Sequence, residues 1–219
     1  MQINYHQYGP GNVLQDIIES EQIITLELSK IFRQAAKSMI ITNAHKVNNG
    51  ESFTEKCDEQ DKIRDFFYIN ETSQDKMMKD IISLCSGRLK QYGNYDFFKN
   101  IQVLTPTKKG IFGTKNLNKC LQEALNLNSK EEKIYGDRIF RKGDRVMQTK
   151  NNYDIFWKKE DEDGAGIFNG ELGIITKIDD IDKNIEIEFD DGKIALYDYS
   201  SLDEIEHSYS ITIHKSQRK

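Results

Sequence analysis

The chain has 219 residues, of which 37% are hydrophobic and 31% charged, and its formal net charge is −5. That length suits one large domain or two small ones, because domains contain roughly 100–200 residues. No apolar run reaches the roughly 18 residues that a membrane-spanning helix needs. The N-terminus lacks the basic start and apolar stretch of a secretory signal. We therefore expect a cytoplasmic globular protein without a membrane partner.

The negative net charge argues against binding nucleic acid by bulk attraction, so a DNA site would have to use local basic clusters. Two clusters occur: Lys108, Lys109 and Lys115 around a glycine loop, and five cations between Arg138 and Lys150. Ordinary solvated charge is the alternative for both. The cysteines and histidines are scattered, without a CxxC pair or zinc-ligand spacing, so we expect reduced thiols and no metal site.

The first 100 residues alternate between helical and strand patterns. Apolar residues three and four apart, preceded by an N-capping Asn, Ser or Thr, predict helices. These are expected at residues 13–18, from Ser29 onward, at 40–47, and from Thr72 or Ser73 to Cys85. Alternating β-branched and aromatic residues predict strands at residues 22–28 and 66–69.

A buried strand is expected at residues 101–106, followed by a glycine loop at 108–114 and a helix over 117–125. The order strand, helix, strand, helix implies a parallel sheet with crossover helices, and therefore an α/β fold.

Short strands dominate after about residue 134. They are predicted at residues 145–149, 173–178, 185–189 and 194–199, and Asp190-Asp191-Gly192 is a hairpin signal. Such closely spaced strands predict a small barrel inserted into the α/β domain. Residues 160–166 are expected to form a flexible acidic loop, and residues 208–217 to begin a helix. Trp157 is expected in a loop, where it either stacks on a ligand or packs.

The motifs of several enzyme classes are missing. The sequence contains no GxSxG, HExxH or Walker A motif, and no strand ends in the paired acids of a Walker B motif. Nothing would cradle a β-phosphate or hold Mg²⁺, so the chain alone is expected neither to hydrolyse ATP nor to bind a cofactor. No carboxylate cluster supports metal-dependent nuclease chemistry.

Five segments, in order, resemble the RecD/TraA family of superfamily 1 DNA helicases. They are GPGNVL at 9–14, IFRQA at 31–35 with IITNAHKVNNG at 40–50, LTP at 104–106 with the KG and GT pairs after it, GDRVMQ at 143–148 with KNNY at 150–153 and FNG at 168–170, and YSITIHKSQ at 209–217. The resemblance covers nearly the whole chain, and its last two segments are the most specific.

The resemblance implies a second RecA-like motor domain, residues 1–141 and 202–219, that carries an inserted SH3-like β-barrel, residues 142–201. The family's glutamine motif GDxxQLPxVGPG is not preserved in residues 1–8, and Arg218-Lys219 stand where the family continues with Gly-Ser-Glu. We therefore expect a fragment, truncated at both ends, of a 5′-to-3′ DNA helicase that uses ATP and Mg²⁺ when complete. The implied partners are single-stranded DNA, the first RecA-like domain of the same chain, and subunits of a repair or recombination complex.

Carried over position by position, the resemblance assigns Arg33 a catalytic role at the γ-phosphate, since a planar guanidinium matches phosphate oxygens. A surface or salt-bridging arginine is the alternative. Gln34 and Gln217 join Arg33 in nucleotide binding. The DNA-binding set has hydroxyl, amide, imidazole, ammonium and backbone N–H groups that suit phosphates. It consists of Thr105, Lys109, Gly110, Asn151, Asn152, Thr212, His214, Lys215 and Ser216.

Structural roles remain as alternatives at several of these positions. The Lys109–Gly110 segment could be a tight strand-to-helix connection with solvated lysines, His214 a packed or capping histidine, and Tyr153 a packing rather than a stacking aromatic. The whole chain could also be a non-catalytic protein- or nucleic-acid-binding module with an SH3-like domain. Salt-dependent binding to single-stranded oligonucleotides distinguishes a DNA role from a protein scaffold.

Overall fold

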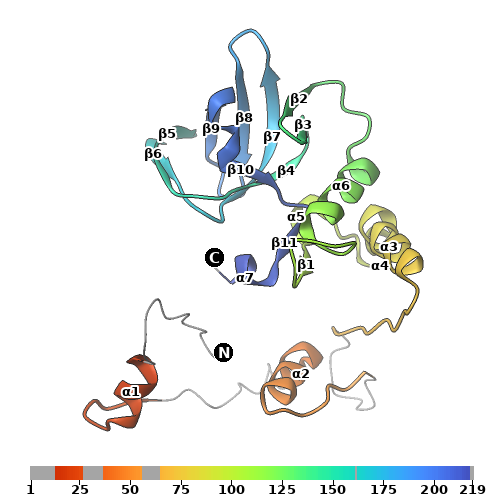
Figure 1. Cartoon of the computed structure of the whole chain (residues 1–219), viewed down its shortest axis with the longest axis vertical. Coiled ribbons are helices and arrows are strands. Elements are labelled where there is room, and N and C mark those ends of the chain that lie inside the picture. The colour runs from red at the N-terminus through yellow and green to blue at the C-terminus, as the bar shows by residue number, and fades with distance from the viewer. Residues whose placement is uncertain (1–12, 27–36, 56–64, 161, 218–219) are drawn as a thin grey trace. The chain divides into compact units, whose positions relative to one another are not determined.

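The computed structural model describes residues 13–26, 37–55, 65–160 and 162–217, and the chain divides into two units, Met1–Asn70 and Glu71–Lys219 (Figure 1). None of the helices in the described ranges is both long enough and apolar enough to span a bilayer.

The described part of the first unit contains α1 (Val13–Glu19) and α2 (Met39–Asn48). Ser38 is the N-cap of α2, and the Asp65 carboxylate accepts hydrogen bonds from Ser38 Oγ at 2.5 Å and Met39 N at 2.8 Å. The hydrogen bond from Ser38, which has the largest effect, and those from the backbone hold the pKa of Asp65 below its usual value. Asn43 is buried and exchanges two hydrogen bonds with Thr54. Helix α2 is thus fixed by polar groups from later in the chain.

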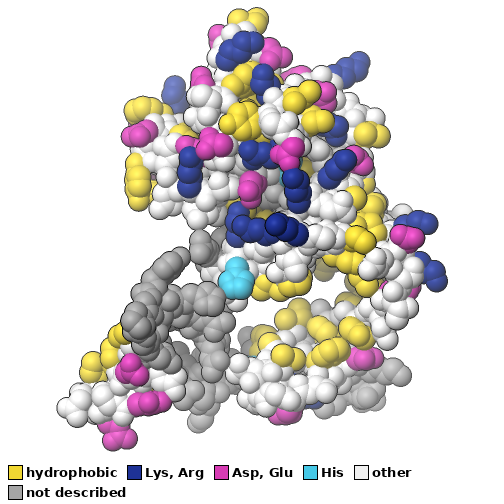
Figure 2. Space-filling model, viewed as in Figure 1, with side chains coloured by type: hydrophobic (Ala, Val, Ile, Leu, Met, Phe, Trp, Pro, Cys, Tyr) yellow, Lys and Arg dark blue, Asp and Glu magenta, His cyan; other side chains and the backbone are white. Residues whose placement is uncertain are grey.

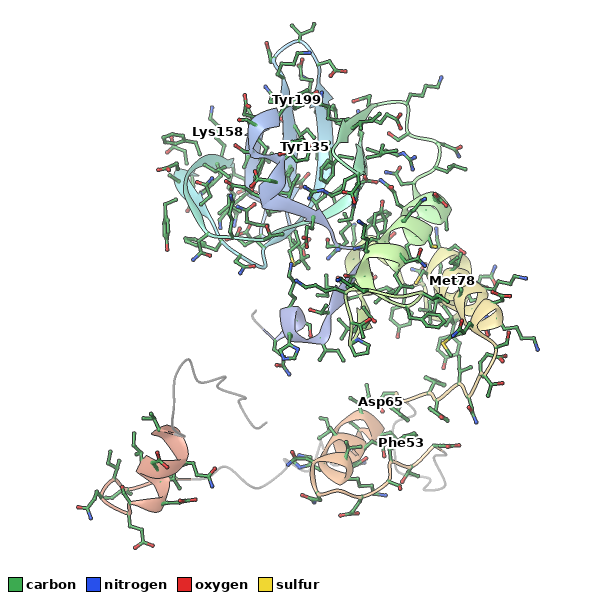
Figure 3. All side chains as sticks on the ribbon, viewed as in Figure 1. Phe53, Asp65, Met78, Tyr135, Lys158 and Tyr199 are labelled. Carbon is green, nitrogen blue, oxygen red and sulfur yellow. The ribbon has the colours of Figure 1, made fainter. Side chains whose placement is uncertain are left out.

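The strand predicted at residues 66–69 is wrong: these residues are not in a strand and pair with no described segment. Their rings pack instead, because Phe66 and Tyr68 meet Phe53 edge-to-face with centroids 5.7 and 5.1 Å away. Figure 3 shows Phe53 and Asp65 next to α2. The strand predicted at 22–28 is absent from its described part, residues 22–26. The helices predicted at 13–18 and 40–47 are confirmed, and the one from Ser29 begins outside the described residues.

In the second unit a group of helices precedes the strands. Helix α3 (Gln74–Ser83) starts at the predicted N-cap Ser73 and continues through the π-helix η2 (Leu84–Arg88) into α4 (Leu89–Gly93). Next come α5 (Phe97–Asn100), β1 (Val103–Thr105) and α6 (Thr114–Leu125). Buried Cys85, Phe97, Leu121 and Tyr209 form one hydrophobic cluster, which fixes these helices to the segment before the last strand.

Strand β1 pairs in parallel with β11 (Ser210–Thr212), which leads into α7 (Ile213–Ser216) (Figure 1). The predicted parallel pairing is therefore confirmed for this pair. Strand β1 is shorter than expected and only partly buried, since Leu104 is 48% exposed. The sequence pattern missed β11, because residues 208–217 were expected to begin a helix.

A seven-stranded antiparallel sheet follows, in the order β10-β4-β7-β8-β9-β5-β6. Its strands are β4 (Arg145–Gln148), β5 (Asn152–Lys159), β6 (Glu162–Ile167), β7 (Leu172–Asp179), β8 (Asn184–Phe189), β9 (Ile194–Asp198) and β10 (Ile205–His207), with the 3₁₀ helix η3 (Tyr199–Glu204) before β10. Ile167, Ile175, Ile185 and Ile187 are fully buried in its core. All four predicted short strands and the hairpin at Asp190–Gly192 are confirmed, with Gly192 at φ +87°.

The predicted acidic loop at 160–166 is wrong, because Glu162–Ile167 is strand β6, paired with β5. Trp157 lies on β5 rather than in a loop and faces Gly164, where an added Cβ would come within 2.6 Å of its ring. The glycine therefore makes room for the indole, while the acids at 162 and 163 stay exposed.

The sheet continues past residue 201 to His207 in β10. An unpredicted hairpin, β2 (Glu132–Tyr135) with β3 (Arg138–Arg141), precedes this sheet. Its Phe140 is fully buried in the core of the seven-stranded sheet, which we call the barrel. Tyr135 and Tyr199, labelled in Figure 3, also pack against that core.

Candidate nucleic-acid interface

Strands β1 and β11 end side by side, with Thr105 opposite Thr212. In a parallel sheet the loops after neighbouring strands emerge at the same edge, where ligands bind in open α/β sheets. Both threonines are buried. Thr105 Oγ1 donates to Phe112 O at 2.6 Å, and Thr212 Oγ1 accepts from Lys215 N at 3.4 Å. The two predicted DNA contacts are thus brought together, and their hydroxyls hold the shape of the loops that follow.

The loop between β1 and α6 is tightly folded. Gly110 has φ +91°, and a Cβ on Gly113 would come within 2.5 Å of Lys109 O, so both positions require glycine. Thr107 Oγ1 donates to Lys109 O at 2.7 Å. Lys108 and Lys109 are exposed and make no ion pair with any described residue. A fixed backbone therefore presents two unneutralised ammonium groups at this edge.

Lys115, the third lysine of this predicted cluster, is neutralised. Its Nζ lies 2.5 Å from Asp137 Oδ2, and both side chains are exposed. The hydrogen bond from Lys115 lowers the pKa of Asp137. The free charge of the loop therefore belongs to Lys108 and Lys109.

The predicted residues after Thr212 lie on α7 and just beyond it. Lys215 Nζ is 3.2 Å from Glu206 Oε2, and Ser216 Oγ donates to Ile213 O at 2.7 Å. His214 and Gln217 are exposed. Arg33 and Gln34 lie outside the described residues, so among these residues Gln217 alone represents the predicted nucleotide set.

Asn151 and Asn152 lie in the barrel, where their amides bond to other barrel residues. Asn151 Oδ1 accepts from Asn169 N at 2.9 Å, and Asn152 Nδ2 donates to Glu204 Oε2 at 2.8 Å. These bonds support a structural role, and DNA contact at both positions stays a prediction. The neighbouring Tyr153 is 67% exposed, with its ring edge-to-face against Phe168.

Sequence reasoning missed a buried carboxylate between the barrel and the β1–β11 sheet. Asp144 is fully buried, and its oxygens accept five hydrogen bonds of 2.6–3.1 Å, from Gln122, Asn126, the Arg141 backbone, His207 and Tyr209. We call this set the Asp144 clamp. Burial, together with the Asp144 carboxylate, raises the pKa of Tyr209. The clamp fastens α6 and the β10–β11 connection to the start of the barrel.

The structure also reveals a pocket of about 300 Å³, lined by two predicted DNA contacts, Lys215 and Ser216, and by residues that were not predicted. Its other polar lining residues include Lys99, Gln102 and Arg145. The sequence offered only the basic character of Arg145 as a signal, since no motif marks Lys99 on the short helix α5 or Gln102 just after it.

Comparison with known proteins points to one family. Residues 117–189 match the model of the ATP-dependent RecD-like DNA helicase SH3 domain. Over 88% of its length the chain is 28% identical to the ATP-dependent RecD2 DNA helicase of Deinococcus radiodurans, and over 90% it is 29% identical to the RecBCD enzyme subunit RecD of Buchnera aphidicola subsp. Schizaphis graminum. The chain is therefore similar to RecD-type helicases along most of its length.

The chain spans 23% and 33% of the lengths of these two relatives. The matched SH3 model includes most of α6 and the barrel through β8. It therefore includes Asp144 and three of its five hydrogen-bond donors, which are Gln122, Asn126 and Arg141. Among solved structures, a Pif1 helicase from Bacteroides in complex with ADP-AlF3 and ssDNA aligns with 87% of this chain and 43% of its own, at 17% identity and a TM-score of 0.44.

Proposed function

We propose that this chain is part of an ATP-dependent DNA helicase that moves 5′ to 3′, and that it contacts single-stranded DNA at the β1–β11 edge. The observation that carries the proposal is the register of Thr105 against Thr212, which gathers the Lys108–Lys109 loop and α7 at one edge. Ammonium groups there suit a phosphate backbone, whose binding to protein is dominated by charge.

In this proposal residues 1–141 and 202–219 form a RecA-like motor domain and the barrel is an insertion in it. Arg33 and Gln34, with Gln217, would hold ATP across a cleft shared with another RecA-like domain. Gln217 is the one member of this nucleotide set among the described residues, and a single exposed amide does not hold a nucleotide. ATP binding in this proposal therefore depends on Arg33 and Gln34. When bound, ATP with Mg²⁺ would supply the free energy for movement along the strand.

Binding of labelled oligothymidine to the full chain at several salt concentrations tests the DNA contact. We expect weak binding whose logarithm falls linearly with the logarithm of salt, and Lys109→Ala and Lys215→Ala should each reduce that slope by about 1. Lys90→Ala, at an exposed position on α4, is the matched control and should leave the slope unchanged. Salt-independent binding, or none, would refute the DNA contact.

A further inference from the structure

The pocket beside α7 lies where the barrel meets the β1–β11 sheet. Its floor is made by Met147 of β4, Leu172 of β7 and Ile211 of β11, which pack as a separate hydrophobic cluster and are 3–5% exposed. The floor is therefore apolar and is built from both parts of the second unit.

The rim of the same pocket is cationic. Lys99, Arg145 and Lys215 line it, and Asp190 is the acid among its lining residues. Arg145 is paired with that acid at 3.2 Å, and Lys215 with Glu206. Lys99 is exposed and has no ion-pair partner among the described residues. Figure 2 shows Lys and Arg side chains gathered in the band between the barrel and α7. The rim suits an anion.

Two buried polar atoms of the lining residues lack a hydrogen-bond partner: Gln102 Oε1 and Arg145 Nε. Buried polar side-chain atoms in folded proteins nearly always have a partner. The lining residues of this hollow therefore leave one acceptor and one donor without a partner among the described residues.

We propose that this pocket receives a single nucleobase of a DNA strand, with the flanking phosphodiester at Lys99 and Lys215. A base is flat and apolar on its faces and carries donors and acceptors at its edge, so it matches the floor and the polar wall. The volume of about 300 Å³ lies at the small end of ligand pockets and fits one base rather than a longer segment. This inference rests on the proposed function, because it assumes that a strand reaches the β1–β11 edge.

The charge half of the inference is tested by Lys99→Glu, with Lys90→Glu as the matched control on α4. Oligothymidine affinity of the full chain should fall roughly fivefold or more for Lys99→Glu, since one phosphate contact is replaced by repulsion. Lys90→Glu should bind as the unaltered chain does. Equal losses in both variants would overturn the proposal, because bulk charge would then explain them.

The base half is tested with an abasic strand of equal length and charge, which should bind roughly fivefold or more weakly if a base is held. A photoreactive halogenated uracil in the strand should also crosslink to the peptides that contain Met147, Leu172 or Ile211. Equal affinity for the abasic strand, or crosslinks only elsewhere, would overturn the base pocket.

The two proposals fail differently. If Lys109→Ala weakens binding while Lys99→Glu and base removal change nothing, the base pocket is wrong and the DNA contact stands. If no strand binds, both are wrong. If polyglutamate displaces the strand as effectively as unlabelled oligothymidine, the pocket takes an acidic polypeptide and the inference is wrong.

Discussion

The barrel and the β1–β11 sheet lie in one unit, but they differ in how much of their apolar side chains is buried. The barrel has seven strands and a core in which Ile175, Ile185 and Ile187 are fully buried. The parallel sheet has two strands among the described residues, and Leu104 in β1 and Ile213, which follows β11, are 48% and 44% exposed. The barrel therefore accounts for stability, whereas the small sheet carries the loops with free cations.

The largest expected effect is a core truncation in the barrel. Ile187→Ala should lower the free energy of unfolding by about 3 kcal/mol, because it leaves a cavity on the central strand β8. Leu104→Ala should lower it by less than about 1 kcal/mol, since that side chain is half exposed. Urea unfolding followed by the fluorescence of Trp157, the single tryptophan, measures the barrel directly. Equal shifts would show that the two regions are not distinct in stability.

The Asp144 clamp should be the strongest link between the two regions. Asp144→Asn replaces one carboxylate oxygen with an amide NH₂ group, which then faces the hydrogen-bond donors around it. We expect the free energy of unfolding to fall by about 3 kcal/mol. The same Trp157 unfolding curve measures the loss. Asp137→Asn breaks only the exposed pair with Lys115, so no measurable change is expected. A clamp that tolerates Asp144→Asn would mean that packing alone joins barrel and sheet.

The cluster beside the small sheet can be examined through its thiol. Burial raises the pKa of Cys85 from 9.0 to about 11, so at neutral pH its thiolate is about a hundredfold scarcer. Iodoacetamide should therefore modify Cys85 at least that much more slowly in the folded chain than in urea, as followed by peptide mass spectrometry. Rapid alkylation would show that this cluster opens readily, unlike the barrel.

The smallest effect is expected at the tip of the β7–β8 hairpin. The hydrogen bond from Lys177, with those from the Asp182 and Ile181 backbone, lowers the pKa of Asp179 to about 2. Any stabilisation from this depressed pKa is present at neutral pH and is lost as the pH falls toward 2. Lys177→Ala should raise the carboxyl's titration midpoint, measured by NMR, and leave the Trp157 unfolding curve unchanged. A clear loss of stability would mean that surface charge, and not the core alone, stabilises the barrel.

Local patterns predicted what depends on local physics. The N-cap Ser73, the Asp-Asp-Gly turn at 190–192 and the four short strands were readable, because capping, turn geometry and period-two alternation are encoded by neighbouring residues. Strand β6 was not, since its acids resemble a loop until Gly164 is seen against Trp157 on the adjacent strand.

The candidate site divides in the same way. The family resemblance predicted that Thr105 and Thr212 serve one DNA site, but their strand pairing was not predicted, because residues 208–217 were expected to begin a helix. Gln102, Lys99 and the Asp144 clamp were not, because each depends on segments brought together from distant parts of the chain. A buried aspartate with five donors looks like any other Gly-Asp turn in the sequence.

Strand β10 lies against β4, with His207 opposite Val146, so the polypeptide leaves the barrel next to the point where it entered. An inserted segment whose two ends lie side by side need not displace the elements that flank it. The entropic cost of bringing its ends together grows only slowly with the length of the insertion. Domains of other sizes can therefore be grafted between these two neighbouring positions while α6 and β11 keep their places. Because β4 and β10 are paired neighbours, we expect that the barrel can be replaced without moving the elements on either side of it.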